Sequence, residues 1–344
     1  MAKVNTIKDF AAQVLASENI EIGTPIILEK ITFVPIVKQE VPREERDYLT
    51  LSEALEEKVC KIIDKGTEVA HIIFENLSDF PILIEEGEIF QGKGTQDRIS
   101  VGTVMVEPQS HIEIAVKCVH APHGLLSGAH FCYGGKASRG MLGTLRKMKY
   151  LNAMMCAPAS AIDQGQVWNQ VSEENASEGA GSDTKYLSAV GSRQKRAKTR
   201  SKEINFPKNT VGVVVIDAEG KYKGFEIHRS PHNFQVRKDG IFESLEANID
   251  WDKKGKGPIP KPKAKVKDLF KKLSELEEGK NALNQVEING IAINMDNISG
   301  EAYTATFYSA TCPSCNQSKP RKKACPHCGK EEEDSDEVAY ISLF

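Results

Sequence analysis

The sequence lacks the long apolar segments of a membrane protein. None of its apolar runs approaches the roughly 20 residues that a membrane-spanning helix needs, and Met1 to Phe10 lacks the unbroken apolar stretch of a signal peptide. We therefore expect a cytoplasmic protein with no membrane partner. Cysteine usage fits a reducing compartment, because four of the eight cysteines form one cluster and the others are scattered singly at Cys60, Cys118, Cys132 and Cys156.

The chain also lacks a strong charge of either sign. Lys and Arg total 45 against 48 Asp and Glu, so the 344 residues carry a formal net charge of −3. This balance excludes a protein whose whole surface attracts nucleic acid or anionic membranes, so any basic binding surface must be local. A hydrophobic fraction of 40% and a charged fraction of 27% are typical of a globular chain.

Short β-rich runs separated by turn residues dominate the first half of the chain. Residues 20–171 contain a series of such runs, broken at Gly23-Thr24-Pro25 and at Asn76 to Asp79, and end in two helical patterns, Met141–Ala157 and Asp163–Glu174. Further strand and helix patterns follow in residues 207–311. We predict an α+β fold in which an antiparallel sheet or sandwich packs with a few helices.

Two polar segments interrupt this pattern. Residues 172–206 lack apolar periodicity and become basic over 193–202, which predicts a largely flexible insertion. Residues 253–267 combine three prolines with seven lysines and predict an extended, positively charged linker. At the ends, we predict an N-terminal extension over residues 1–19 and a closing strand within residues 331–344.

The strongest chemical signal is a pair of Cys-x-x-Cys motifs near the C-terminus. Strand-like sequence on both sides predicts a zinc ribbon over residues 312–330, at the tip of a hairpin. Four thiolates leave no coordination position for a substrate, so we predict one structural zinc ion per chain. A redox site or a site without metal is the alternative. The predicted ligands are Cys312, Cys315, Cys325 and Cys328.

Cations between the two motifs raise the hypothesis of a nucleic-acid partner. They could contact phosphates together with the basic runs at residues 193–202 and 253–267, if all three segments converge. Acidic residues 331–334 follow directly, and no aromatic residue is interleaved for base stacking, so a charge-balanced surface is the alternative. The cations are Lys319, Arg321, Lys322 and Lys323.

A second group of metal-ligating residue types lies between residues 118 and 132. Alternation on a strand would put Cys118 and His120 on one face, and a turn could bring His123, His130 and Cys132 back to them. Such a group could bind a second metal ion and support hydrolysis. Loop histidines and buried thiols are the alternative.

Polar residues also accumulate where apolar strands stop. Glu85, Glu86 and Glu88 are followed by Gln96-Asp97-Arg98. Carboxylates beside an arginine could perform acid–base chemistry or hold a metal. They could equally form an ion pair at a solvated strand end.

A set of short motifs along the chain carries a family resemblance. They are Asn76, Ser78, Asp79, Pro81 to Ile84, Gly87-Glu88, Gly92, Gln96 to Arg98, Pro108, Ser110, Cys118-Val119, Asp163-Gln164, Val167-Trp168, Val211-Gly212, Phe225-Glu226 and Ala339 to Phe344. With these residues the chain resembles the ADP-ribosylglycohydrolase and rhodanese-phosphatase associated protein family, type one. The resemblance extends from about Ile20 to the end of the chain and implies an α+β domain, the ARPP-1-like domain, associated with ADP-ribose or NAD-linked pathways. The basic segments and the zinc ribbon resemble insertions into it.

We therefore expect a ligand-binding or adaptor protein for a nucleotide-like or ADP-ribose-like molecule. Arg98 would pair with phosphate, and Glu88 and Asp97 would accept hydrogen bonds from ribose hydroxyls. Gln96 would line the same pocket, and Trp168 could stack on a base. The alternatives are a nucleic-acid- or ribosome-associated zinc-ribbon protein and, less strongly, a metal-dependent hydrolase; a protein partner and the presence of any reaction are left open.

Overall fold

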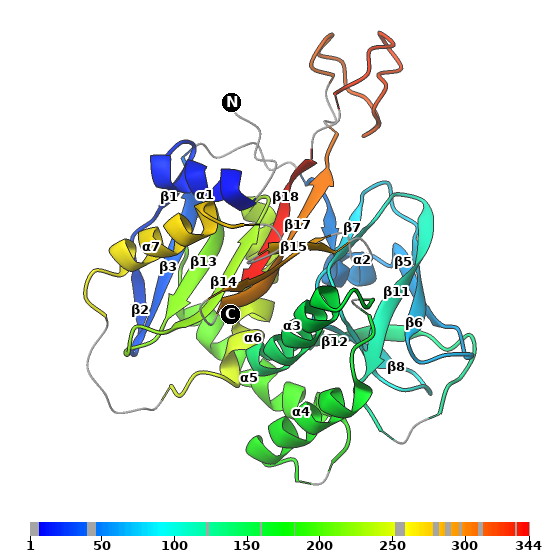
Figure 1. The fold of residues 1–344 in the computed structure, drawn as a ribbon. Helices are drawn as coiled ribbons and strands as arrows, with labels where there is room; N and C mark the ends of the chain where they lie inside the picture. Colours follow the sequence, from blue (N-terminus) through cyan, green and yellow to red (C-terminus); the bar gives the residue numbers. More distant parts are fainter. Residues whose placement is uncertain are drawn as a thin grey trace.

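Largely antiparallel sheets covered by helices form the molecule (Figure 1). The computed structural model describes residues 7–39, 46–121, 124–158, 160–181, 183–251, 259–277, 282–285, 290–295, 298–308, 312–333 and 336–343. The helices are α1 (Ile7–Ala16), α2 (Leu51–Glu56), α3 (Arg139–Met154), α4 (Gln164–Ser177), α5 (Tyr186–Glu203), α6 (Pro231–Glu246) and α7 (Pro262–Ser274). The strands are β1 (Ile20–Ile22), β2 (Ile26–Leu28), β3 (Ile31–Lys38), β4 (Leu49–Thr50), β5 (Cys60–Asp64), β6 (His71–Asn76), β7 (Ile82–Ile84), β8 (Glu88–Gly92), β9 (Arg98–Ser100), β10 (Val104–Val106), β11 (Ser110–Cys118), β12 (Phe131–Lys136), β13 (Thr210–Ile216), β14 (Tyr222–His228), β15 (Ala282–Gln285), β16 (Gly290–Met295), β17 (Ile298–Thr306) and β18 (Asp336–Leu343).

The largest sheet is covered on both faces. Its nine strands run in the order β1-β3-β13-β14-β18-β17-β16-β15, with β2 paired to β3. Strand β13 is buried at every position, because α1 and α7 pack on one face of the sheet and α5 and α6 on the other. Phe270 of α7 meets Phe10 of α1, and Phe242 of α6 stacks on Phe33 of β3 at 5.3 Å.

A second sheet system forms the other half of the molecule. Six strands run in the order β12-β8-β9-β11-β6-β5, beside a three-stranded sheet, β10-β7-β4. A bridge joins Ile63, in edge strand β5, to His130, next to edge strand β12, so the six-stranded sheet curls back on itself. Phe74, Phe90 and Phe131 fill its interior, while α3 and α4 pack on its other side. The predicted α+β fold is confirmed.

Side-chain caps fix where several helices begin. The Ser138 hydroxyl accepts a hydrogen bond from the Met141 amide at the start of α3, and Asp163 and Ser230 do the same for α4 and α6. Thr50 and Glu53 form a capping box on α2. These local signals set the direction of α3, which carries the charged residues described below.

The prediction of a flexible insertion over residues 172–206 is wrong. Helix α4 extends to Ser177, and α5 packs against α6 with Tyr186, Val190 and Ala197 buried. The helical spacing was obscured because a charged residue shares the buried face. The Arg193 guanidinium lies 5.2 Å from the centre of the Tyr186 ring and pairs with Glu174 on α4.

The predicted linker over residues 253–267 is wrong in its last part. Helix α7 begins at Pro262, which suits the first position of a helix because the amide there needs no intrahelical partner. Residues 252–258 lie outside the described residues. The consequence is that the lysines from Lys263 onward have fixed positions on a helix surface.

Residues 312–333 project from the hairpin of β17 and β18 (Figure 1). Strand β18 then returns between β17 and β14 and closes the largest sheet. Over the part of the chain that the structure describes, we find no helix with the length and apolar character needed to cross a membrane.

We predict that α5 is an integral part of the fold. Ala197→Asp places a carboxylate at a fully buried position against α6 and should lower the free energy of unfolding by about 3 kcal/mol or more. Lys198→Asp, at the exposed neighbouring position, should change it by less than about 1 kcal/mol. Urea unfolding of both variants provides the comparison, and equal small effects would show that α5 does not pack on the core.

Candidate functional site

Strand β9 buries Arg98 completely. Arg98 lies opposite Phe90 of β8 and Cys118 of β11, and its side chain has no exposed surface. Its Nη1 donates to the carbonyl of Gln96 at 2.9 Å, but Nε and Nη2 meet no hydrogen-bond acceptor among the described residues. The closest carboxylate oxygen, Oδ2 of Asp64, is 3.9 Å from Nη2. Burial lowers the pKa of Arg98, yet a guanidinium keeps its charge at neutral pH.

Polar atoms without hydrogen bonds also lie on the two residues that precede Arg98. Asp97 accepts a hydrogen bond from the Gly92 amide through Oδ1 at 2.9 Å, whereas its Oδ2 accepts none from the described residues. His120 Nδ1 and Lys185 Nζ approach Oδ2 at 3.6 and 3.9 Å. The side-chain oxygen of Gln96 is likewise buried without a hydrogen bond in the described structure.

Helix α4 brings Trp168 to the same region. The Gln164 side chain bonds both the amide and the carbonyl of Cys118, at 3.1 and 2.7 Å, and so fixes α4 to β11. One turn later, Trp168 reaches the Cys118 thiol while its side chain stays 40% exposed. Burial raises the pKa of Cys118, so this thiol is a poor nucleophile at neutral pH. We call Gln96, Asp97, Arg98, Cys118 and Trp168 the Arg98 site.

Glu88, the remaining residue of the predicted pocket, lies elsewhere. It is two residues along β8 from Phe90, the partner of Arg98. Its Oε2 accepts a hydrogen bond from the Glu85 amide at 3.0 Å, and its Oε1 lies 3.2 Å from Nη1 of Arg237. The structure thus brings four of the predicted residues together and assigns Glu88 to another cluster.

That cluster is a buried set of ion pairs between the two sheet systems, which we call the central charge network. Glu85 receives two hydrogen bonds of 2.9 Å from Arg237 and one of 2.5 Å from Lys136. Glu86 pairs with Arg146 and Lys149 at 2.6 and 2.5 Å. The remaining pairs are Lys149 with Glu301 at 2.8 Å and Arg139 with Glu226 at 2.5 Å.

The paired cations control the ionisation of these carboxylates. Burial alone would raise the pKa of Glu85, but Arg237 and Lys136 hold it well below its usual range. Burial also opposes ionisation of Glu226, and Arg139 outweighs it to lower the pKa to about 2. For Glu88, burial wins and the charge of Glu85 adds to it, so the pKa rises to about 7.

The second metal group predicted around Cys118 is not assembled in the described structure. The Cys118 thiol contacts the backbone of His120, whose ring faces Asp97, and His123 lies outside the described residues. Two groups with metal-binding spacing occur among the described residues: the four ribbon cysteines, and Glu68 with His71 and Glu113. Lys65 already bridges the two carboxylates of the latter group, at 2.5 and 3.0 Å.

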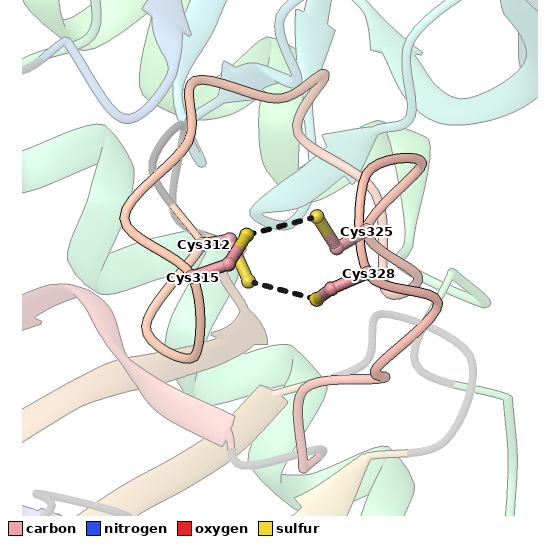
Figure 2. A group of neighbouring side chains, drawn as sticks. All are labelled: Cys312, Cys315, Cys325 and Cys328. Carbon is pink, nitrogen blue, oxygen red and sulfur yellow. Dashed lines mark hydrogen bonds between the residues drawn. The ribbon is translucent and has the colours of Figure 1, made fainter.

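The four ribbon cysteines face one another in two pairs (Figure 2). The sulfur atoms of Cys312 and Cys328 are 3.7 Å apart, those of Cys315 and Cys325 are 3.8 Å apart, and all four lie within 4.8 Å of one another. A tetrahedral ion with metal–sulfur bonds of about 2.3 Å places its sulfurs about 3.8 Å apart. The arrangement therefore fits a single tetrahedral metal ion.

Most cations proposed to contact nucleic acid have partners within the protein. Lys319 pairs with Glu332, and Lys323 lies 3.9 Å from Glu331. Arg321 pairs with Asp47 and lies over the Phe80 ring. On α5, Arg193, Arg196 and Arg200 all pair with glutamates. These pairs reduce the positive charge that the ribbon and α5 offer to phosphate.

A small cleft of about 120 Å³ lies away from all these groups. Lys30 and Lys223 face Asp217, Glu219 and Asp250 across it, so its charges largely offset one another. Asp217 and Lys223 already pair at 3.4 Å. No residue of the Arg98 site lines this cleft. The shape of the cleft alone does not indicate a ligand.

We predict that Glu88 makes stability fall with rising pH in a specific window. A carboxyl with a native pKa of about 7 binds a proton in the native state when the unfolded chain, near the usual 4.5, has released it. The free energy of unfolding of the wild type, relative to Glu88→Gln, should therefore decrease by roughly 3 kcal/mol as the pH rises from about 4.5 through 7, and level off above that. Urea unfolding across this range tests it, and a pH-independent difference would contradict the raised pKa.

Comparison with known proteins agrees with the resemblance seen in the sequence. Residues 19–304 match the family described as ARPP-1, the ARG and Rhodanese-Phosphatase-superfamily-associated Protein domain. Searches of curated proteins and of solved structures found no match. The match includes the Arg98 site and ends within β17, before the ribbon and β18. The chain belongs to the ARPP-1 domain family.

Proposed function

We propose that the protein is a cytoplasmic binding protein for a nucleotide-like ligand of the ADP-ribose or NAD type, which occupies the Arg98 site. The observation that carries the proposal is the state of Arg98: a fully buried guanidinium with two nitrogens that no described residue accepts from. Burying a charge without full hydrogen bonding is costly, and an anionic oxygen supplied by a ligand would remove this cost.

The neighbouring side chains suit the other parts of such a ligand. Asp97 Oδ2 and the Gln96 side-chain oxygen are acceptors without hydrogen bonds from the described residues, as ribose hydroxyls require. The partly exposed ring of Trp168 offers a face for a base. The family description adds independent support, since it names an association with ARG, the ADP-ribosylglycohydrolase group. Glu88 is omitted from the proposal because both of its carboxylate oxygens already have partners, Arg237 and the Glu85 amide.

We further propose that the ribbon metal is one structural zinc ion per chain. Zinc has no geometric preference that opposes a tetrahedron of thiolates, and four cysteines leave no position open for a substrate. The two sulfur–sulfur distances near 3.8 Å support this choice.

The ligand proposal is tested with variants of Arg98 and Trp168. By isothermal titration with ADP-ribose, NAD and ADP, Trp168→Ala should weaken binding about tenfold, which corresponds to about 1.4 kcal/mol. Leu151→Ala removes a similarly exposed apolar side chain from the neighbouring helix α3 and should leave affinity unchanged. Arg98→Lys, which keeps the charge but loses the planar donor pair, should weaken binding more than Trp168→Ala. Unaltered affinity in both site variants, or no binding by the wild type, would exclude the Arg98 site.

The zinc proposal is tested by elemental analysis of protein purified without added metal. We expect one zinc per chain, released by a chelator together with unfolding of the ribbon. Cys315→Ser should lose the metal, whereas Cys156→Ser, at an exposed cysteine outside the ribbon, should retain it. A second equivalent of metal would revive the metal-dependent hydrolase, and no metal in the wild type would remove the zinc centre.

A further inference from the structure

We infer that the exposed lysine face of helix α7 is a docking surface for the phosphate backbone of a nucleic-acid duplex. This surface is separate from the cations of the ribbon and of α5, and it goes beyond the proposed nucleotide site. Helix α7 and the residue before it hold six lysines between Lys261 and Lys272, against a single carboxylate, Asp268.

The helix separates its lysines from its apolar residues. Val266, Leu269, Phe270 and Leu273 are fully buried against α1 and the largest sheet. Lys263, Lys267 and Lys271 follow one another at intervals of four residues, so they form one stripe along the helix. All three are exposed, as is Lys261 just before the helix. The three lysines of the stripe are spaced about 6 Å apart along the helix axis.

These lysines are free of internal partners, unlike Lys319, Arg321 and Lys323 of the ribbon and the three arginines of α5. Within the described part of the chain, none of Lys261, Lys263, Lys267 and Lys271 forms an ion pair or a side-chain hydrogen bond. Lys265, on the flank, lies 4.8 Å from the centre of the Tyr222 ring. By contrast, the arginines on α5 hold Glu178 and Glu246 beside them, so carboxylates offset the positive potential there.

The positive charge of the exposed lysines on α7 favours a partner with many negative charges. The burial of the apolar side chains of α7 then indicates which kind of polyanion fits. Membrane-surface helices insert large apolar side chains, but the large apolar side chains of α7 are buried in the protein. The stripe carries no aromatic residue, so it offers no stacking surface for single strands. What remains is a row of point charges. Their 6 Å interval is close to the rise of about 7 Å along the duplex axis between every second phosphate of one strand. Such contacts bind without reading sequence.

The test is binding of short fluorescein-labelled DNA and RNA duplexes of mixed sequence to the whole protein, by fluorescence anisotropy over a range of salt concentrations. The logarithm of the wild-type affinity should fall with the logarithm of salt with a slope of about −3, as for three or four phosphate contacts. The combined variant Lys263→Glu, Lys267→Glu, Lys271→Glu should bind at least tenfold more weakly, with a slope near zero. Circular dichroism confirms that this variant is folded.

A matched control carries the same charge change on α5: Lys195→Glu, Lys198→Glu, Lys202→Glu, all exposed positions. It should keep most of the wild-type affinity. Three results would overturn the inference: no duplex binding by the wild type at low salt, equal losses in the two triple variants, or binding to phosphatidylserine vesicles in place of duplexes. Titration of the α7 variant with ADP-ribose keeps the two proposals apart, because the Arg98 site shares no residue with α7.

Discussion

The central charge network is the constraint on which the arrangement of the two sheet systems depends. Helix α3 supplies Arg139, Arg146 and Lys149 from one side, and carboxylates from both sheet systems pair with them. Two of these residues also bond Ser342 on β18, the strand that closes the largest sheet. A buried charge that loses its partner costs about 3 to 5 kcal/mol, so few of these residues can change without moving α3.

The central charge network and the Arg98 site differ in how closely their charged groups are paired. The carboxylates of the network have cations within 2.5 to 3.2 Å, whereas the closest carboxylate oxygen to Arg98 is 3.9 Å away. Both guanidinium groups, those of Arg98 and Arg237, are almost fully buried. Only Arg237 has a carboxylate partner for each of its three guanidinium nitrogens. We therefore assign a structural role to the central charge network and a binding role to the Arg98 site.

How far the sequence predicted this structure depended on whether a feature was local. Turn residues and the two cysteine motifs act over a few residues, and the strands and the thiolate cluster follow from them. The grouping of Gln96, Asp97 and Arg98 was also local. In contrast, the partners of Glu88 come from α6 and β12, about 150 and 50 residues further along the chain. Pairing over such distances depends on strand register, which alternation alone does not give.

Buried charge explains the features that the sequence did not predict. Lysine and arginine are rarely buried without partners, so residue type alone does not indicate that Arg139, Arg146, Lys149 and Arg237 lie in the interior. Arg193 concealed the buried face of α5 in the same way. A signal was present in α3, where Arg139, Arg146 and Lys149 share the helical spacing of Leu142 and Leu145, but only the folded structure shows that this face is buried.

The central claim of our account is that an anionic group of a nucleotide-like ligand accepts hydrogen bonds from Arg98, whose Nε and Nη2 have no acceptor among the described residues. The most direct measurement is a crystal structure of the protein grown with ADP-ribose. Our account predicts phosphate oxygens within hydrogen-bonding distance of Arg98 Nε and Nη2, with an adenine or ribose against Trp168. A ligand bound elsewhere, for example in the cleft between Lys30 and Asp217, with Arg98 unchanged, would contradict it.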